Sequence, residues 1–285
     1  MIQLSRVGLG TNNFGRRLDL DGARAVVDAA LDAGITHLDT ADIYGGGESE
    51  RLIGVILEGR RDEAVIATKF GMGDGANGSR AYVRGAIERS LTSLRTDHVD
   101  LYYLHRPQDD TPVGESVGYI AELVGEGKVR HIGVSNVTAE QLREAVAVAP
   151  VAVVQNEYSL LEREAERELL PACRELGVGF VPYFPLASGR LTGKYRRGEP
   201  MPPNTRLAGQ EIDDATFDTL EALEAFAEER GHTLLELAIA ALASRPEVAS
   251  VIAGAMSPEQ VRANAAAGAW QLGEADLSAL ANLEA

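Results

Sequence analysis

The chain has 285 residues, of which 45% are hydrophobic and 25% are charged, the ordinary balance of a folded globular protein. Its formal charge of −16 at pH 7 argues against a nucleic-acid or anionic-membrane partner, because both would repel such a surface. The first residues lack the pattern of a signal peptide, and no apolar run approaches the roughly 20 residues that span a bilayer. The single cysteine, Cys173, has no partner for an internal disulfide, which is typical of a reducing compartment. We therefore expect a cytoplasmic protein with neither a membrane nor a nucleic-acid partner.

Short apolar, β-branched runs alternate with segments of helical period along the chain. The predicted strands span residues 7–10, 35–39, 64–70, 99–105, 129–134, 151–155, 178–181 and 248–253. The predicted helices between and after them span residues 21–33, 48–58, 79–94, 113–126, 138–147, 163–176, 233–244 and 258–267. Continuous apolar strands separated by helices indicate a parallel sheet that is buried on both faces.

Eight strand–helix units suggest that the sheet closes into a (β/α)8 TIM-type barrel, a fold that commonly takes about 250 residues. A doubly wound open sheet is the main alternative, and the spacing of the elements does not exclude it. Two additional helices are predicted near residues 214–229, after the seventh strand, and near residues 274–283. No linker or shift in composition divides the chain, so we expect residues 1–285 to form one catalytic domain.

Chemically reactive side chains lie where three predicted strands end. Asp39 ends the second strand, Lys69 lies near the end of the third, His105 ends the fourth, and Tyr44 follows Asp39 by five residues. Reactive groups of parallel barrels lie at the C-terminal ends of strands and in the loops that follow. Because successive strands are usually neighbours, a carboxylate, a phenol, an amine and an imidazole are predicted to meet at one rim.

Each of these residues also has a structural interpretation when taken alone. Asp39 is in a position to cap the next helix, Tyr44 to pack in a loop and His105 to sit in the core with its hydrogen bonds satisfied. Lys69 is harder to explain in this way, because an ammonium group deep in a barrel mouth requires a partner. The occurrence of all four at one rim favours a site.

The four groups together predict the reduction of a carbonyl. A phenol has a pKa of about 10, and a nearby lysine ammonium favours the phenolate and so lowers the pKa of Tyr44. The Asp39 carboxylate holds Lys69 charged and oriented, and the neutral His105 imidazole donates a hydrogen bond that orients the carbonyl. Because this set lacks a nucleophile, it requires hydride from a cofactor.

Ordered motifs over nearly the whole chain resemble those of the aldo-keto reductases. They are Asp39-Thr40-Ala41-x-x-Tyr44-Gly45 with Ser49-Glu50, Ser90-Leu91-x-x-Leu94-x-x-Asp97-x-x-Asp100-Leu101-Tyr102-x-x-His105, Gly133-Val134-Ser135-Asn136, Gln155-Asn156-Glu157-Tyr158, Tyr183-Phe184-Pro185-Leu186-Ala187-Ser188-Gly189 and Leu191-Thr192-Gly193-Lys194-Tyr195. The resemblance implies a TIM-type barrel, a nicotinamide cofactor bound in extended form without a Rossmann domain, and reduction of an aldehyde or ketone to an alcohol. It assigns Tyr44 as the general acid, Asp39 and Lys69 as the groups that tune its pKa, and His105 as the group that orients the carbonyl.

The resemblance also implies a set of cofactor contacts. Ser135, Asn136 and Gln155 are expected to bind the nicotinamide carboxamide and Tyr183 to stack on the ring, with Gly10, Thr11 and Asp39 as further contacts. The segment Phe184, Pro185, Leu186, Ala187 and Ser188 is expected near the pyrophosphate, with positive charge from Lys194 and Arg206. The adenosine end is expected at Gly254, Ala255, Met256, Ser257, Gln260 and Asn264, where a helix N-terminus faces the 2′-phosphate.

Two features of the chain depart from the family pattern. Related reductases frequently carry Arg or Lys at the position of Met256 or of Gln260, and the loss of such a charge weakens the preference for NADP over NAD. Because Ser257, the helix dipole, Lys194 and Arg206 are expected to compensate, NADP(H) stays the favoured cofactor and NAD(H) the alternative. The chain also begins almost directly at the first strand, and only a remnant such as Gln3-Leu4-Ser5 is left to cover the barrel floor.

Other functions are less well supported by the sequence. A regulatory subunit that senses the cofactor with little turnover is the main alternative, because intact site motifs permit both. A metal-dependent hydrolase is disfavoured, because His37-x-Asp39 is not a His-x-His pair and no second cluster of ligands follows; we expect no metal. The small-molecule carbonyl substrate is not identified by the sequence. Loop residues such as Asn12, Phe14, Met72 and Arg106, and the loops around residues 109–114 and 191–207, are expected to shape its pocket. Neither the direction of the reaction in the cell nor the oligomeric state follows from the sequence.

Overall fold

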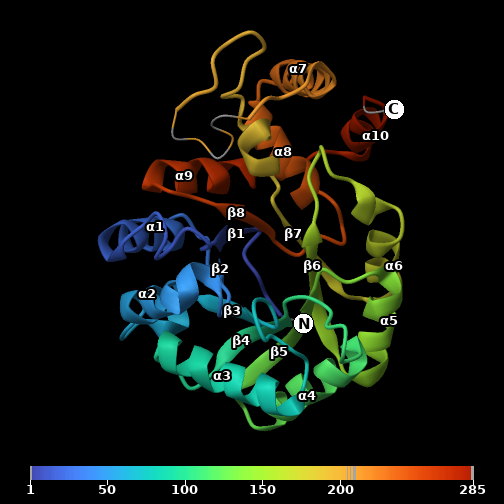
Figure 1. Ribbon diagram of the computed structural model, residues 1–285. Coiled ribbons are helices and arrows are strands. Elements are labelled where there is room, and N and C mark those ends of the chain that lie inside the picture. The colour runs from blue at the N-terminus through green and yellow to red at the C-terminus, as the bar shows by residue number, and fades with distance from the viewer. Residues whose placement is uncertain (1, 204, 206, 208–209, 284–285) are drawn as a thin grey trace.

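Eight parallel strands form one sheet in the computed structural model, which describes residues 2–203, 205, 207 and 210–283 (Figure 1). The order across the sheet is β7-β6-β5-β4-β3-β2-β1-β8, so successive strands are neighbours throughout. The strands are β1 Val7–Gly10, β2 His37–Asp39, β3 Val65–Phe70, β4 Val99–Leu104, β5 Val129–Ser135, β6 Val151–Glu157, β7 Gly179–Tyr183 and β8 Val251–Gly254. All eight correspond to strands predicted from the sequence.

The two outer strands of this order are joined by a short bridge. Phe180 on β7 pairs with Val248, just before β8. The Phe180 N–H donates to the Glu247 carbonyl oxygen at 2.7 Å, and the Ala249 N–H donates to the Phe180 carbonyl oxygen at 2.8 Å. The sheet therefore closes on itself, which confirms the predicted (β/α)8 barrel and excludes the open doubly wound sheet.

In the described part of the chain, eight helices cover the outside of the barrel and two more lie beyond it (Figure 1). The covering helices are α1 Leu20–Asp32, α2 Glu48–Ile56, α3 Arg80–Leu94, α4 Val113–Gly125, α5 Ala139–Val148, α6 Leu169–Leu176, α8 Leu234–Ala243 and α9 Pro258–Ala267. The additional helices are α7 Asp214–Glu228 and α10 Glu274–Asn282, at the places predicted for them. Among the described residues, none of the helices has the length and apolar composition that would let it cross a membrane.

One predicted helix is shorter than expected. The segment 163–176 begins with an isolated 3₁₀ turn, Glu164–Glu166, and the α-helix starts only at Leu169. Pro171 explains the difference, because a proline is tolerated in the first turn of a helix but not in its interior. A continuous helix from residue 163 would have placed Pro171 in its interior, so the prediction of its start was wrong.

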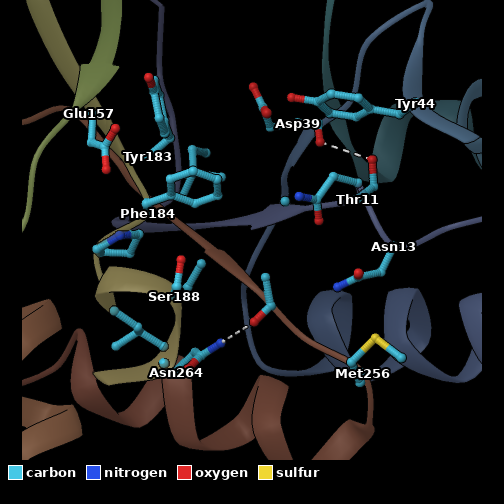
Figure 2. A pocket seen from close by; sticks show the side chains of 18 of the residues that line it. Thr11, Asn13, Asp39, Tyr44, Glu157, Tyr183, Phe184, Ser188, Met256 and Asn264 are labelled. Carbon is cyan, nitrogen blue, oxygen red and sulfur yellow. Dashed lines mark hydrogen bonds between the residues drawn. The ribbon is translucent and has the colours of Figure 1, made fainter. Parts of the chain in front are cut away.

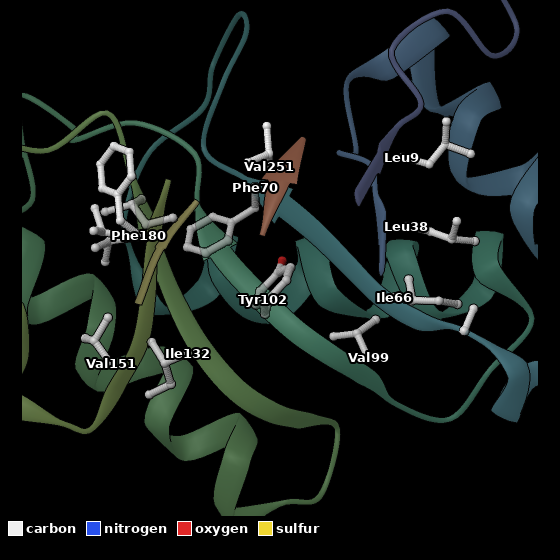
Figure 3. Close-up of a cluster of buried hydrophobic side chains, with 14 of the residues drawn as sticks. Leu9, Leu38, Ile66, Phe70, Val99, Tyr102, Ile132, Val151, Phe180 and Val251 are labelled. Carbon is white, nitrogen blue, oxygen red and sulfur yellow. The ribbon is translucent and has the colours of Figure 1, made fainter. Parts of the chain in front are cut away.

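Alternate residues of each strand point into the barrel and out toward the helices. The outward side chains, including Leu9, Leu38, Ile66 and Tyr102, are fully or almost fully buried beneath the helices (Figure 3). The inward cluster consists of Ala67, Leu101, Tyr103, Val153, Val181 and Ile252. Glycine is required at position 133, because a Cβ atom there would lie 2.4 Å from Cδ1 of Tyr103. The interior is thus a packed core that supports the rim above it.

The N-terminal segment covers the barrel floor. Ile2 and Leu4 are partly buried and pack against the inward cluster. Ser5 Oγ accepts hydrogen bonds from the backbone N–H groups of Thr36 and His37, at 3.1 and 3.0 Å. This short segment therefore seals the end of the barrel from which the strands start, opposite the rim at which they end.

Candidate active site

A buried ion pair lies where β2 and β3 end. Lys69 Nζ is 2.6 Å from Asp39 Oδ1 and donates a second hydrogen bond to the Thr40 carbonyl oxygen at 2.8 Å. The side chain of Lys69 is fully buried, and Asp39 is 3% exposed. The second oxygen of Asp39, Oδ2, accepts a hydrogen bond from Gln155 Nε2 at 2.8 Å. The pairing confirms that Lys69 has the partner that its burial requires.

Tyr44 and His105 complete the cluster. Lys69 Nζ lies 5.2 Å from the centroid of the Tyr44 ring. The Tyr44 and His105 rings are 5.9 Å apart and nearly perpendicular, at 78°. Figure 2 shows Tyr44 beside Asp39 at one end of the pocket. The structure therefore brings all four predicted side chains to one place.

The turn that carries Tyr44 depends on glycine. Tyr44–Gly47 is a 3₁₀ turn in which Gly45 has φ 62°, in the left-handed region that strongly favours glycine. A Cβ atom on Gly45 would lie 2.6 Å from the carbonyl oxygen of Phe14, so the turn packs directly against the loop after β1. The backbone contact places the phenol, and a side chain at position 45 would displace it.

The electrostatics of Tyr44 differ from the expectation. Burial raises the pKa of the Tyr44 phenol above its usual value, and the charge of Lys69 and its hydrogen bond only partly oppose this. Asp39 also raises the pKa of Tyr44. Lys69 lowers the pKa of Tyr44 as predicted, but burial outweighs this effect, so in the protein alone the pKa of the phenol is raised above its usual value. Tyr44 is consequently protonated at neutral pH and able to donate.

His105 is held in its neutral form. Burial lowers its pKa to about 3, and the positive charges of Lys69 and Arg106 act in the same direction. Its backbone N–H donates to the Phe70 carbonyl oxygen at 2.7 Å, which ties the end of β4 to the end of β3. A neutral imidazole carries one N–H donor and one acceptor nitrogen, as the orientation of a carbonyl requires.

These side chains lie at one end of a cavity of about 790 Å³. It is lined by most of the residues predicted to contact a cofactor, namely Gly10, Thr11, Asp39, Ser135, Asn136, Gln155, Tyr183, Phe184, Pro185, Leu186, Ser188, Lys194, Gly254, Met256, Gln260 and Asn264. Ala187, Ala255 and Ser257 do not line it, and Arg206 lies outside the described residues. The cavity runs from Tyr44 to Met256 and Asn264 (Figure 2).

The middle of the cavity is organised by Asn136, which has φ 58°. Its Nδ2 donates to the His105 carbonyl oxygen at 2.9 Å and to Ser135 Oγ at 3.0 Å. Its Oδ1 accepts a hydrogen bond from the Tyr183 hydroxyl at 2.7 Å. Asn136 therefore fixes the Tyr183 ring relative to His105, which is the geometry that a stacking surface for a planar ring needs.

The part of the cavity between Tyr183 and Asn264 has a strongly turned backbone, and a cation, Lys194, also lines the cavity (Figure 2). Phe184, Ala187 and Ser188 all have positive φ angles, an arrangement found in backbone segments that bind anions. The ammonium of Lys194 lies over this turn, since a Cβ atom on Gly189 would be 2.8 Å from Lys194 Nζ. Together they fit a pyrophosphate group.

The start of α9, at the other end of the cavity, is capped by its own side chains. Ser257 Oγ accepts from the Gln260 N–H at 3.4 Å, and Gln260 Oε1 accepts from the Met256 N–H at 2.7 Å. No arginine or lysine lines the cavity among the described residues of this segment. Among the described residues, this end of the cavity therefore offers only uncharged groups to a 2′-phosphate.

Several lining residues were not predicted. They are Asn13, Arg17, Glu157, Gly189, Leu235, Ile252, Ala253 and Ala263, whereas Thr192 and Thr205 belong to the loop 191–207 that was expected to shape the pocket. Ile252 and Ala253 belong to β8, and several of the others lie in loops after strands, where position along the barrel rim was the only available signal. The expected pocket residues Asn12, Met72 and Arg106 do line the cavity. Phe14 was wrongly placed there, because its loop folds back and its side chain is fully buried in the core.

The histidine considered as a metal ligand lies inside the barrel. His37 Nδ1 is 3.0 Å from Ser250 Oγ, and burial lowers the pKa of His37 to about 4. Within the described part of the chain, no group of three or more His, Cys, Asp or Glu side chains is arranged to hold a metal ion.

Comparisons with known proteins agree with this geometry. Residues 6–285 match the model of the aldo/keto reductase family. The chain is 36% identical over 291 residues to a probable aldo-keto reductase 1 of Glycine max, covering 96% of this chain and 84% of that protein. It is 37% identical over 274 residues to a probable voltage-gated potassium channel subunit beta of Oryza sativa subsp. japonica, covering 88% and 83%.

Solved structures give the same result. The glycerol dehydrogenase AKR11B4 from Gluconobacter oxydans superposes with a TM-score of 0.88 at 31% identity, over 98% of this chain and 91% of that one. The aldo-keto reductase AKR11C1 from Bacillus halodurans, in its holo form, superposes with a TM-score of 0.85 at 32% identity, over 99% and 93%. The family model matches nearly the whole chain, and the barrel superposes on solved structures of the family. The chain therefore belongs to the aldo/keto reductase family of oxidoreductases.

Proposed function

We propose that the protein reduces an aldehyde or ketone to an alcohol with Tyr44 as the general acid and NADP(H) as the favoured cofactor. The observation that carries the proposal is the convergence of Asp39, Tyr44, Lys69 and His105 at the end of a cavity of about 790 Å³ that most of the expected cofactor contacts line. The nicotinamide supplies the hydride, which none of these side chains can provide.

The side chains of the site orient the carbonyl group, donate the proton and stabilise the charge that the proton leaves behind. Neutral His105 donates a hydrogen bond to the carbonyl oxygen, which orients and polarises it. Tyr44, protonated at neutral pH, gives its phenolic proton to the same oxygen. Buried Lys69, kept charged by Asp39, stabilises the negative charge that develops on the Tyr44 oxygen as the proton leaves. Lys69 thus stabilises the Tyr44 oxygen mainly during proton transfer, when negative charge develops on it, and less before the transfer begins.

The cavity supports a nicotinamide dinucleotide in this position. Tyr183 presents its ring beside Asn136 for stacking, and Lys194 with the turned backbone of Phe184 and Ser188 receives the pyrophosphate. The end of the cavity expected to hold the 2′-phosphate offers weaker electrostatic attraction, because Met256 and Gln260 are uncharged. NAD(H) is therefore the alternative cofactor, and side-by-side Kd measurements for NADPH and NADH decide between them.

The central test is Tyr44→Phe in the purified protein, with reduced-nicotinamide absorbance followed over a panel of aldehydes. Loss of the proton donor is expected to lower kcat by about 10²–10⁴-fold while cofactor binding is nearly unchanged. Tyr119→Phe is the matched control, because that hydroxyl bonds Glu115 on the outer helix α4. Turnover by Tyr44→Phe at the wild-type rate would show that another group protonates the oxygen.

A cofactor-sensing regulatory subunit is the second candidate, supported by the similarity to the rice channel subunit. Tight cofactor binding with negligible turnover of every aldehyde in the panel would favour it over the reductase.

A further inference from the structure

Three cationic side chains line the cavity in the described part of the chain: Arg17, Arg106 and Lys194. Many other arginines of this acidic protein form ion pairs, for example Arg61 with Asp100 and Arg245 with Glu166. None of the three cavity cations forms an ion pair with a carboxylate of the described residues, although carboxylates outnumber cations in the chain by 43 to 27. Cations left unpaired around a cavity in such a protein point to anionic ligands.

The three cations do not lie at the same end. Lys194 lies over the turn at Gly189, where the cofactor's pyrophosphate is expected, and Arg17 belongs to the loop after β1. Arg106 directly follows His105 at the end of β4. Its positive charge is close enough to lower the pKa of His105 and to oppose the rise in the pKa of Tyr183. It therefore lies at the end where the carbonyl group reacts, and the cofactor's phosphates do not account for it.

Only the backbone of Arg106 is held by the protein. Its carbonyl oxygen accepts a hydrogen bond from Gln108 Nε2 at 2.7 Å, whereas its guanidinium has no partner among the described residues. The guanidinium is exposed at the cavity, and its forked N–H groups match the two oxygens of a carboxylate or phosphate. Arg106 is thus positioned by its backbone and left free to bind a ligand by its side chain.

We propose that Arg106 recognises a negatively charged group of the substrate, so that this protein prefers small carbonyl compounds bearing a carboxylate or a phosphate. The proposal rests on the proposed reductase function and adds the chemical class of its substrate. Glu157 limits where the anion lies, because its carboxylate also lines the cavity, beside Tyr183 (Figure 2). The anionic group is therefore held on the Arg106 side, away from Glu157.

Matched pairs of substrates test the proposal. Succinate semialdehyde is compared with its methyl ester, and glyceraldehyde 3-phosphate with glyceraldehyde, by measuring kcat/KM for each. The wild-type protein is expected to favour the charged member of at least one pair by about tenfold or more, the usual strength of a charge-assisted contact. The pair that shows the larger ratio distinguishes a carboxylate from a phosphate.

Variants test whether the preference for charged substrates comes from the Arg106 side chain. Arg106→Gln is expected to remove most of the charged-to-neutral ratio and Arg106→Lys to restore part of it, mainly through KM. Glu157→Gln is expected to move the ratio in the opposite direction, since it removes a negative charge from the same end. Arg16→Gln is the control, because Arg16 is exposed beside Arg17 but does not line the cavity.

The possible failures are distinct. Turnover of both members of each pair with no preference, or a preference that Arg106→Gln leaves intact, would overturn the assignment of Arg106 and leave the reductase standing. A fall in the ratio for both Arg106→Gln and Glu157→Gln would overturn it too, because the ratio would then report general damage. Absence of turnover with every aldehyde, neutral ones included, would instead overturn the proposed function on which the inference rests.

Discussion

Asp42, three residues after Asp39, carries a carboxyl group whose burial makes the stability of the fold depend on pH. Its Oδ1 is buried without a hydrogen-bond partner among the described residues, and its backbone N–H donates to the Lys69 carbonyl oxygen at 3.1 Å. Burial, and after it the charge of the nearby Glu50 on α2, raise the pKa of Asp42 to about 7. Arg89 on α3, the Ile43 N–H and Lys69 on β3 act in the opposite direction.

The sign and size of the effect follow from these values. The ordinary pKa of 3.8 applies to the unfolded chain and the raised pKa of about 7 to the folded protein, so folding takes up a proton between them. Stability therefore falls as the pH rises through this window and levels off above it. A difference of about 3 pKa units at about 1.4 kcal/mol each costs about 4 kcal/mol above pH 7. About half of this, roughly 2 kcal/mol, accumulates between about pH 5.5 and about pH 8.

Asp42→Asn removes this ionisation while keeping the shape of the side chain. The variant is expected to exceed the wild type in free energy of unfolding at pH 8, and the difference between them should shrink by about 2 kcal/mol at pH 5.5. Urea denaturation of both proteins at the two pH values measures this. Asp74→Asn, at an exposed loop position, is the control for loss of a surface charge. If Asp42→Asn and the wild type changed equally with pH, Asp42 would not be protonated in the folded protein.

Two further substitutions test the loop that carries Tyr44 and the adenosine end of the cavity. Gly45→Ala is expected to destabilise the fold by about 1–3 kcal/mol more than Gly46→Ala in urea denaturation, because both positions have positive φ but only the Cβ at 45 meets the Phe14 carbonyl oxygen. Equal losses in the two variants would mean that backbone strain alone matters. Met256→Arg is expected to tighten NADPH about tenfold or more and NADH much less, by adding a charge-assisted contact. Equal changes in the two Kd values would place Met256 away from the 2′-phosphate.

The barrel and the catalytic cluster followed from local features of the chain. Apolar strands such as residues 64–70 and 99–105 alternate with helical segments, and this pattern is compatible only with a parallel sheet covered by helices. In such a barrel all strands end at one rim, so Asp39, Lys69 and His105 had to converge without any knowledge of side-chain packing. The parallel sheet covered by helices and the meeting of the tetrad were therefore predictable from the sequence, whereas the open doubly wound sheet was excluded only by the bridge between Phe180 and Val248.

The tertiary structure decided the properties that depend on depth and on distant neighbours. The pKa of Tyr44 rises because burial outweighs the charge of Lys69, and burial is set by the packing of the whole rim. Phe14 turns into the core because its loop folds back against Gly45, a contact between segments about thirty residues apart. Arg106 was expected in the substrate pocket, but its role in binding an anion, and the role of Glu157, emerged only from the charges that line the cavity. Residue types and their order determined which groups meet, whereas three-dimensional packing determined how strongly each is shielded from water and what remains free to bind.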